Sequence, residues 1–107
     1  MQDQAKLMNE MGKITDAVVI ITNQICGMEE SDKTWLANVQ TLMDLTGDIP
    51  LGLYETPVPK VRSLTPEMMT WVARSGRFVF HKDTSLDLQT MVKKINAVKA
   101  IPDTPLM

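Results

Sequence analysis

Residues 77–85 read RFVFHKDTS and indicate the fold most clearly. The apolar run from Phe78 to Phe80 is typical of a strand buried on both faces, as parallel strands usually are. The stretch reaches Lys82, three small polar residues follow, and a helical pattern begins at Leu86. Because α/β proteins bind ligands at the carboxyl ends of parallel strands, Lys82 lies where a ligand site is expected.

Two further strands are predicted upstream of this stretch. Residues 16–22, DAVVIIT, form a mainly β-branched run without polar alternation, which favours a central parallel strand over a half-exposed one. Residues 49–54, IPLGLY, form a second apolar run, with a proline that is tolerated at a strand entrance.

Apolar residues at helical spacing and capping signals predict four helices around these strands. The helices extend over residues 2–11, from Ser31 to the stop at Gly47, from Thr65 to Gly76, and from about Leu86 to Lys99. Ser31 and Thr65 each offer an N-cap hydroxyl, and Pro66 suits the first helical position. The last helix is expected to turn its lysines to solvent and its apolar residues inward; these are Lys93, Lys94 and Lys99, and Leu88, Met91, Val92, Ile95 and Val98.

The repeated alternation of helix and strand predicts an α/β fold with a parallel sheet and helices packed outside it. Residues 1–107 form a single domain in this interpretation. Three strands do not close a barrel, which takes eight strands and roughly 250 residues. The strands therefore form either a small open sheet or part of a barrel, and the tail after Pro102 is typical of a link into another strand.

Composition excludes several classes of function. A net charge of −2 gives no basis for binding nucleic acid or an anionic membrane surface. The longest apolar run, residues 17–21, is too short to span a bilayer, and no signal peptide opens the chain. The single cysteine, Cys26, excludes an internal disulfide and favours a reducing, cytoplasmic location. Metal-ligand spacing, a glycine-rich phosphate fingerprint and a nucleophile elbow are absent from the sequence, so no metal or cofactor is expected.

The carboxyl ends of the three strands are expected to converge and to carry Thr22 and Asn23, Tyr54 and Glu55, and Lys82, Asp83 and Thr84. Partial burial of Lys82 would disfavour its ammonium form, and the neutral amine could form a Schiff base with a carbonyl compound. Tyr54 would supply a phenol that moves protons. The simpler alternatives are a Lys82 that reaches solvent, a Tyr54 that packs its ring, and a Glu55 that neutralises Lys82. Strand alternation turns His81 to the opposite face, among helices.

Two motifs carry a resemblance to a known family. Residues 49–57, IPLGLYETP, are similar to a family stretch that ends in Tyr-Asn-x-Pro, and residues 78–85, FVFHKDTS, are similar to its Lys-Asp-x-Ser stretch. The family is that of the pyruvate-dependent class I aldolases, typified by dihydrodipicolinate synthase and N-acetylneuraminate lyase. The spacing of the motifs and the helix start LTPE at residues 64–67 match as well. The resemblance covers nearly the whole chain and implies roughly the fourth to sixth βα units of a TIM (β/α)8 barrel.

The resemblance implies a chemistry for these residues. Lys82 would form the Schiff base with the keto carbon of pyruvate or a related 2-oxo acid, and Tyr54 would shuttle protons while a bond to an aldehyde forms or breaks. The candidate substrate-binding residues are Thr22, Glu55 and Thr84. No cofactor is implied, and the full-length protein would be a homo-oligomer, commonly a tetramer.

The chain departs from the family pattern at three places. Glu55 replaces the usual asparagine, and Pro59 stands where synthases carry a carboxylate-binding arginine. Lys60 and Arg62 are the two alternatives for that arginine. Residues 22–25, TNQI, replace a Thr-Pro-Tyr-Tyr segment, so the tyrosine that synthase subunits exchange is missing. These differences argue against the synthase reaction of lysine biosynthesis and leave the imine chemistry intact.

The sequence therefore predicts part of a cytoplasmic class I aldolase or lyase barrel, inactive as an isolated piece because several strand ends are missing. The alternative is a non-catalytic small α/β module, or a truncated relict, in which Lys82 is structural.

Overall fold

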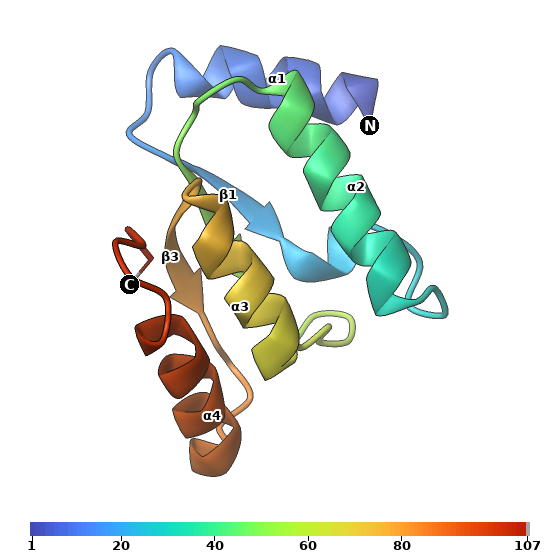
Figure 1. The fold of residues 1–107 in the computed structure, drawn as a ribbon. Coiled ribbons are helices and arrows are strands. Elements are labelled where there is room, and N and C mark those ends of the chain that lie inside the picture. Colours follow the sequence, from blue (N-terminus) through green and yellow to red (C-terminus); the bar gives the residue numbers. More distant parts are fainter. Residues whose placement is uncertain (107) are drawn as a thin grey trace.

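The computed structural model describes residues 1–106, and its helices and strands alternate along the chain as predicted (Figure 1). The elements are α1 (Gln2–Gly12), β1 (Val18–Ile21), the 3₁₀ helix η1 (Thr22–Gln24), α2 (Asp32–Leu45), β2 (Leu51–Tyr54), α3 (Pro66–Ser75), β3 (Phe78–Lys82) and α4 (Leu88–Lys99). Among these residues, none of the helices combines the length and the apolar character that crossing a membrane requires.

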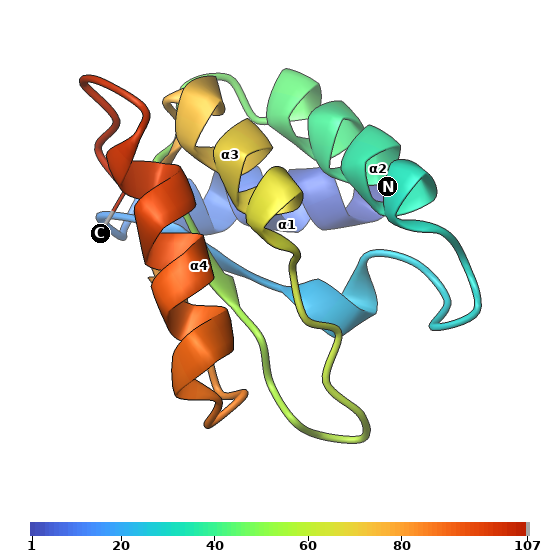
Figure 2. The same ribbon diagram turned by 60° about the horizontal axis from the view of Figure 1, so that its bottom comes forward.

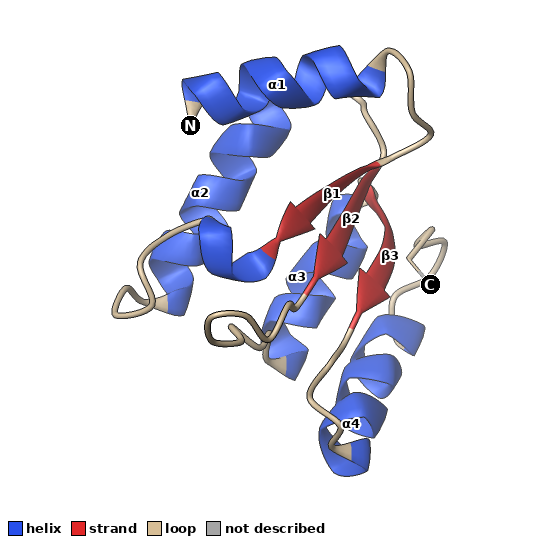
Figure 3. Ribbon diagram, turned by 180° about the vertical axis from the view of Figure 1, so that it is seen from behind, coloured by secondary structure: helices blue, strands red, loops and turns tan. Residues whose placement is uncertain are grey.

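The three strands form one parallel sheet in the order β1-β2-β3, so each strand pairs with the next along the chain. All three arrows point to the same end of the molecule, where the loops that follow the strands gather (Figure 3). Helix α3 lies between α2 and α4 in both front views (Figures 1 and 2). Seen from behind, the sheet lies in front of α2 and α3, so both of these crossover helices cover the same face (Figure 3).

The two faces of the sheet therefore differ. The helix-covered face carries Val18, Ile20, Leu51, Leu53, Phe78 and His81, while the opposite face, here called the open face, carries Val19, Ile21, Gly52, Tyr54, Phe80 and Lys82. In β1, Val18 and Ile20 are buried, whereas Val19 and Ile21 are 43% and 38% exposed. The prediction that this strand is buried on both faces is wrong for the described chain, because helices pack on one side of it only.

The main core lies between the helix-covered face and helices α2 and α3. Trp35 and Val39 of α2, Leu53 of β2 and Val72 of α3 have no exposed surface. Burial of one such aliphatic side chain stabilises the fold by about 1.5–3 kcal/mol. The indole nitrogen of Trp35 donates to the carbonyl of Thr22 at 2.9 Å, so the buried polar atom keeps a partner.

The predicted helix signals act as expected. The Ser31 hydroxyl accepts a hydrogen bond from the Thr34 amide, and the Thr65 hydroxyl accepts one from the Met68 amide. Gly76 ends α3 in the left-handed conformation, with φ of 71°, which a residue without Cβ adopts at low cost. These local signals explain why the helix starts and stops could be read from sequence.

Helix α4 differs from the prediction in its start and in its buried face. It begins at Leu88, after the Asp87 side chain caps the Thr90 amide, because Leu86 has a left-handed φ of 57°. Lys94 is buried, whereas Leu88 is 75% and Ile95 51% exposed. The predicted inner stripe is therefore correct for Val98, which packs against the core, and wrong for Leu88 and Ile95. The prediction that Lys94 faces solvent is also wrong, since carboxylates at the strand ends draw it inward.

The pairing of β2 with β3 contains an irregularity that decides which side chain faces Tyr54. Leu51 pairs with Phe78, but Gly52 pairs with Phe80, so Val79 is an extra residue in β3. A one-residue shift turns every later side chain to the other face. Tyr54 consequently pairs with Lys82 and not with the preceding histidine.

Candidate functional site

Lys82 and Tyr54 lie side by side on the open face, at the carboxyl ends of β3 and β2. They are direct partners across the ladder, and the Lys82 Nζ lies 4.7 Å from the centroid of the Tyr54 ring. An ammonium over an aromatic ring is attracted by about 0.5–1 kcal/mol at an exposed site. The structure thus brings together the two residues predicted to be catalytic, and their catalytic role stays a prediction.

The row of residues below this pair is apolar and closely packed. Phe80 pairs with Gly52, and a Cβ at position 52 would lie 2.3 Å from the Phe80 Cε1. Glycine is therefore required for the Phe80 ring to lie across the strand. The open face therefore has two parts. Gly52 and Phe80, with Val19 beside them, form a packed apolar row, and Tyr54 and Lys82 lie next to it at the strand ends.

Two of the predicted substrate-binding residues use their hydroxyls in the fold. The Thr22 Oγ1 donates to the Arg62 carbonyl at 2.8 Å, and Thr22 has no exposed surface. The Thr84 Oγ1 donates to the Glu55 carbonyl. Both protons are thus committed to the main chain, and the Thr22 side chain is not accessible to a substrate in this structure.

Glu55 does not lie with Lys82, because strand alternation carries its side chain to the helix-covered side. Its carboxylate is completely buried and accepts hydrogen bonds from the Lys94 Nζ at 2.7 Å and the Leu64 amide at 2.8 Å. The alternative in which Glu55 neutralises Lys82 is therefore wrong. Glu55 was also a predicted substrate ligand, but its side chain lies on the other side of the sheet from the Lys82 amine.

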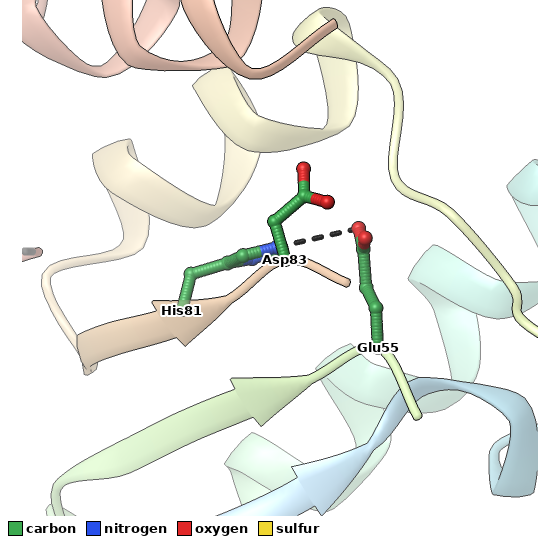
Figure 4. A group of neighbouring side chains, drawn as sticks. All are labelled: Glu55, His81 and Asp83. Atoms are coloured by element: carbon green, nitrogen blue, oxygen red, sulfur yellow. Dashed lines mark ion pairs between the residues drawn. The ribbon is translucent and has the colours of Figure 1, made fainter. Parts of the chain in front are cut away.

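His81 lies beside Glu55, with its Nε2 3.3 Å from the Glu55 Oε1 (Figure 4). Its side chain is 7% exposed and contacts a cavity of about 440 Å³ between β3, α3 and α4. Met69, Met91 and Val98 line the walls of this cavity. The prediction that His81 packs among helices, opposite Lys82, is confirmed.

Lys94 completes this buried cluster and was missed by sequence reasoning. Its Nζ donates to the Glu55 Oε1 at 2.7 Å and to the Asp83 Oδ2 at 2.9 Å, and its side chain is 4% exposed. A helical position among exposed lysines gave no signal of burial. The sequence offered one hint of a buried cation: Glu55 and Asp83 directly follow the candidate catalytic residues Tyr54 and Lys82.

Lys94 and its neighbours keep both carboxylates ionised. Burial by itself raises the pKa of Glu55, but the contacts from His81, Lys94 and the Leu64 amide outweigh it and hold the pKa below its ordinary value of 4.5. Burial likewise raises the pKa of Asp83, and hydrogen bonds from Ser85 and Lys94 lower it below 3.8. The cluster is therefore an ionised network with an internal counterion.

Glu55, His81 and Asp83 each offer an oxygen or nitrogen within 4.8 Å of the others, which is close enough for a metal site (Figure 4). The sequence had indicated no metal-ligand spacing, because these residues come from two different strand ends. In the structure, the Lys94 ammonium lies between the two carboxylates at hydrogen-bonding distance. It already supplies the positive charge that a metal ion would bring.

Arg62, one alternative for the missing carboxylate-binding arginine, is not available for that role. Its guanidinium donates to the carbonyls of Gly27 and Glu30 at 3.0 and 2.8 Å, and the residue is 6% exposed. It joins the loops that follow β1 and β2. Lys60, the other alternative, is exposed in the loop after β2.

The fold and the strand ends define the class: an α/β protein with a three-stranded parallel sheet, helices on one face, and a lysine–tyrosine pair on the other. No family model matches the chain, and no curated protein matches it either.

Proposed function

We propose that the chain forms three consecutive βα units, roughly the fourth to the sixth, of a TIM barrel. The strand order follows the chain order, and both crossover helices lie on one face. A doubly wound sheet carries helices on both faces, whereas a barrel keeps all of its helices outside. The apolar open face, with Val19, Ile21 and Phe80, would be the barrel interior.

We further propose that the full-length barrel is a class I aldolase or lyase that acts on pyruvate or a related 2-oxo acid. The observation that carries this proposal is the pairing of Lys82 with Tyr54 on the open face, 4.7 Å from Nζ to ring centroid. Lys82 is exposed in the described chain, so the partial burial expected from the sequence is not found here; closure of the barrel would enclose this face.

In the proposed reaction, the Lys82 amine attacks the keto carbon, and the carbinolamine loses water to give an imine. The Tyr54 phenol gives a proton to the departing hydroxyl and accepts one back during later steps. The protonated imine draws electrons from the neighbouring carbon, which loses a proton and becomes an enamine. The enamine adds to an aldehyde, whose oxygen takes up a proton, and water then hydrolyses the regenerated imine to release the product and the free Lys82 amine. The reverse sequence cleaves the same carbon–carbon bond.

Reduction with borohydride in the presence of pyruvate tests the proposal. The full-length chain should acquire a stable pyruvate adduct, and peptide mass mapping should place it on Lys82. Lys82→Ala should abolish the adduct, whereas Lys93→Ala, at an exposed position of α4, should leave it unchanged. A folded full-length protein without an adduct on Lys82 would contradict the imine mechanism.

The second candidate is a non-catalytic α/β module, and the stacking of Lys82 on Tyr54 is the observation that favours it. The ammonium lies over the ring face, which is a stabilising contact that needs no chemistry. In that case pyruvate would give no adduct, and Lys82→Met would change only stability, by about 0.5–1 kcal/mol.

A further inference from the structure

The residues that directly follow Tyr54 and Lys82 are both acids, and both contact the same cation. Glu55 follows Tyr54, Asp83 follows Lys82, and the Lys94 Nζ lies 2.7 Å and 2.9 Å from their carboxylates. The three side chains are 0%, 12% and 4% exposed, in the order Glu55, Asp83, Lys94. One ammonium therefore joins the ends of β2 and β3.

The main chain strengthens the same junction. The Glu55 amide donates to the Lys82 carbonyl at 3.0 Å, and the Thr84 hydroxyl donates to the Glu55 carbonyl. The Glu55 carboxylate also accepts from the Leu64 amide at 2.8 Å, which ties in the loop before α3. Glu55 is thus hydrogen-bonded to Lys82 itself and to Thr84, two residues further on, so a shift of Glu55 would be transmitted to the end of β3.

We propose that Lys94 is a positioning residue that clamps the ends of β2 and β3 from the helix-covered side. By doing so, it sets the separation and orientation of the Lys82 amine and the Tyr54 phenol on the open face. This inference rests on the proposed function, and it adds a residue that touches neither the substrate nor the reacting atoms.

The charges explain why a cation is needed at this point. Without Lys94, two ionised carboxylates would face each other in a buried site, and like charges there repel strongly. His81 lies 3.3 Å from Glu55, but its nitrogens lack hydrogen-bond geometry to any partner in residues 1–106. Lys94 is therefore the group that holds the two carboxylates at fixed distances.

The expected effect on chemistry follows from geometry. A misplacement of about 1 Å between reacting groups costs on the order of 10²-fold in rate. Loss of the clamp should slow imine formation at Lys82 without changing how pyruvate is bound, because Lys94 and the open face lie on opposite sides of the sheet.

The test measures borohydride trapping of pyruvate on Lys82 in the full-length protein, over a range of pyruvate concentrations. Lys94→Met should lower the maximal trapping rate about tenfold or more, while the half-saturating pyruvate concentration stays within about twofold. Lys94→Arg, which can still bridge two carboxylates, should recover most of the rate. Lys93→Met, on the exposed side of the same helix, should trap at the unaltered rate.

Each outcome has a distinct meaning. Trapping by folded Lys94→Met at the unaltered maximal rate would overturn the positioning role and leave the proposed function standing. Absence of any Lys82 adduct in the unmodified protein would overturn both. Where Lys94→Met fails to fold, Asp83→Asn replaces it, because its amide oxygen still accepts from the Ser85 amide while its NH₂ group faces the Lys94 ammonium and cannot accept from it. An unaltered maximal rate in that variant would again overturn the inference.

Discussion

The two faces of the sheet treat their charged groups in opposite ways. On the helix-covered side, Glu55 and Lys94 are buried, the Asp83 side chain is 12% exposed, and the Lys94 Nζ is bonded to both carboxylates at 2.7 and 2.9 Å. On the open face, the Lys82 side chain is exposed and lies over the Tyr54 ring, with no ion pair to a carboxylate within residues 1–106. A lysine whose hydrogen bonds are committed to carboxylates supports structure, whereas an amine without such bonds can react.

The largest effect on activity should come from removing the Lys82 amine, which is bonded to no carboxylate of the described residues. If the proposed barrel and imine mechanism hold, Lys82→Ala in the full-length protein should lower turnover by on the order of 10³-fold or more, since that mechanism has no second nucleophile. The fold should persist, because the side chain is exposed. Steady-state kinetics beside circular dichroism would check this, and normal turnover by the variant would show that the imine assignment is wrong.

Removing the Lys94 ammonium, which bridges two carboxylates, should instead lower the stability of the fold. Lys94→Ala leaves the Glu55 and Asp83 carboxylates buried without their cation, which should lower the free energy of unfolding by about 3–5 kcal/mol. Lys93→Ala is the matched control, one residue earlier and exposed, with an expected change within about 0.5 kcal/mol. Urea denaturation measures both free energies of unfolding. A Lys94→Ala effect as small as that of Lys93→Ala would mean that the buried network does not stabilise the fold.

The packed apolar row of the open face should respond to volume. Gly52→Ala places a Cβ 2.3 Å from the Phe80 ring, so the ring must move, at about 1–3 kcal/mol of stability. In a Phe80→Ala background, the same glycine substitution should be close to neutral. A double-mutant cycle measures this coupling. If Gly52→Ala lowers stability equally with and without the Phe80 ring, contact with that ring is not the cause.

Acid should weaken the helix-covered side gradually. Burial raises the pKa of Glu55 and of Asp83, but their hydrogen bonds outweigh it, so both folded values lie below 4.5 and 3.8. The unfolded chain then binds protons more readily, and the stability these groups contribute is present above those ordinary values and lost as pH falls through the folded ones. Denaturation from about pH 5 to about pH 3 should show this loss, and Glu55→Gln should make it shallower.

Local features were read correctly from the sequence because their causes are local. Ser31, Thr65 and Gly76 act on backbone groups within one helical turn, and their positions alone predict the helix ends. The three short apolar runs likewise predicted the strands. The pairing of Lys82 with Tyr54 was expected from the resemblance and from the convergence of parallel strand ends.

Other features depended on neighbours distant in the chain. The apolar residues of α4 predicted an inner stripe that included Ile95, but Lys94 is buried because Glu55, 39 residues earlier, supplies a carboxylate. Thr22 was a candidate ligand by position, yet the Arg62 carbonyl takes its hydroxyl proton. Such pairings cannot be read from periodicity.

By itself, the sequence determined the order of helices and strands, the helix ends, and the acid that follows each member of the candidate catalytic pair, because these are properties of neighbouring residues. Only the tertiary structure decided which face each side chain occupies. The extra residue Val79 in β3 shifts the pairing so that Lys82, and not His81, lies opposite Tyr54. Strand side chains alternate with a period of two, so one inserted residue exchanges the two faces, and no local pattern records that exchange.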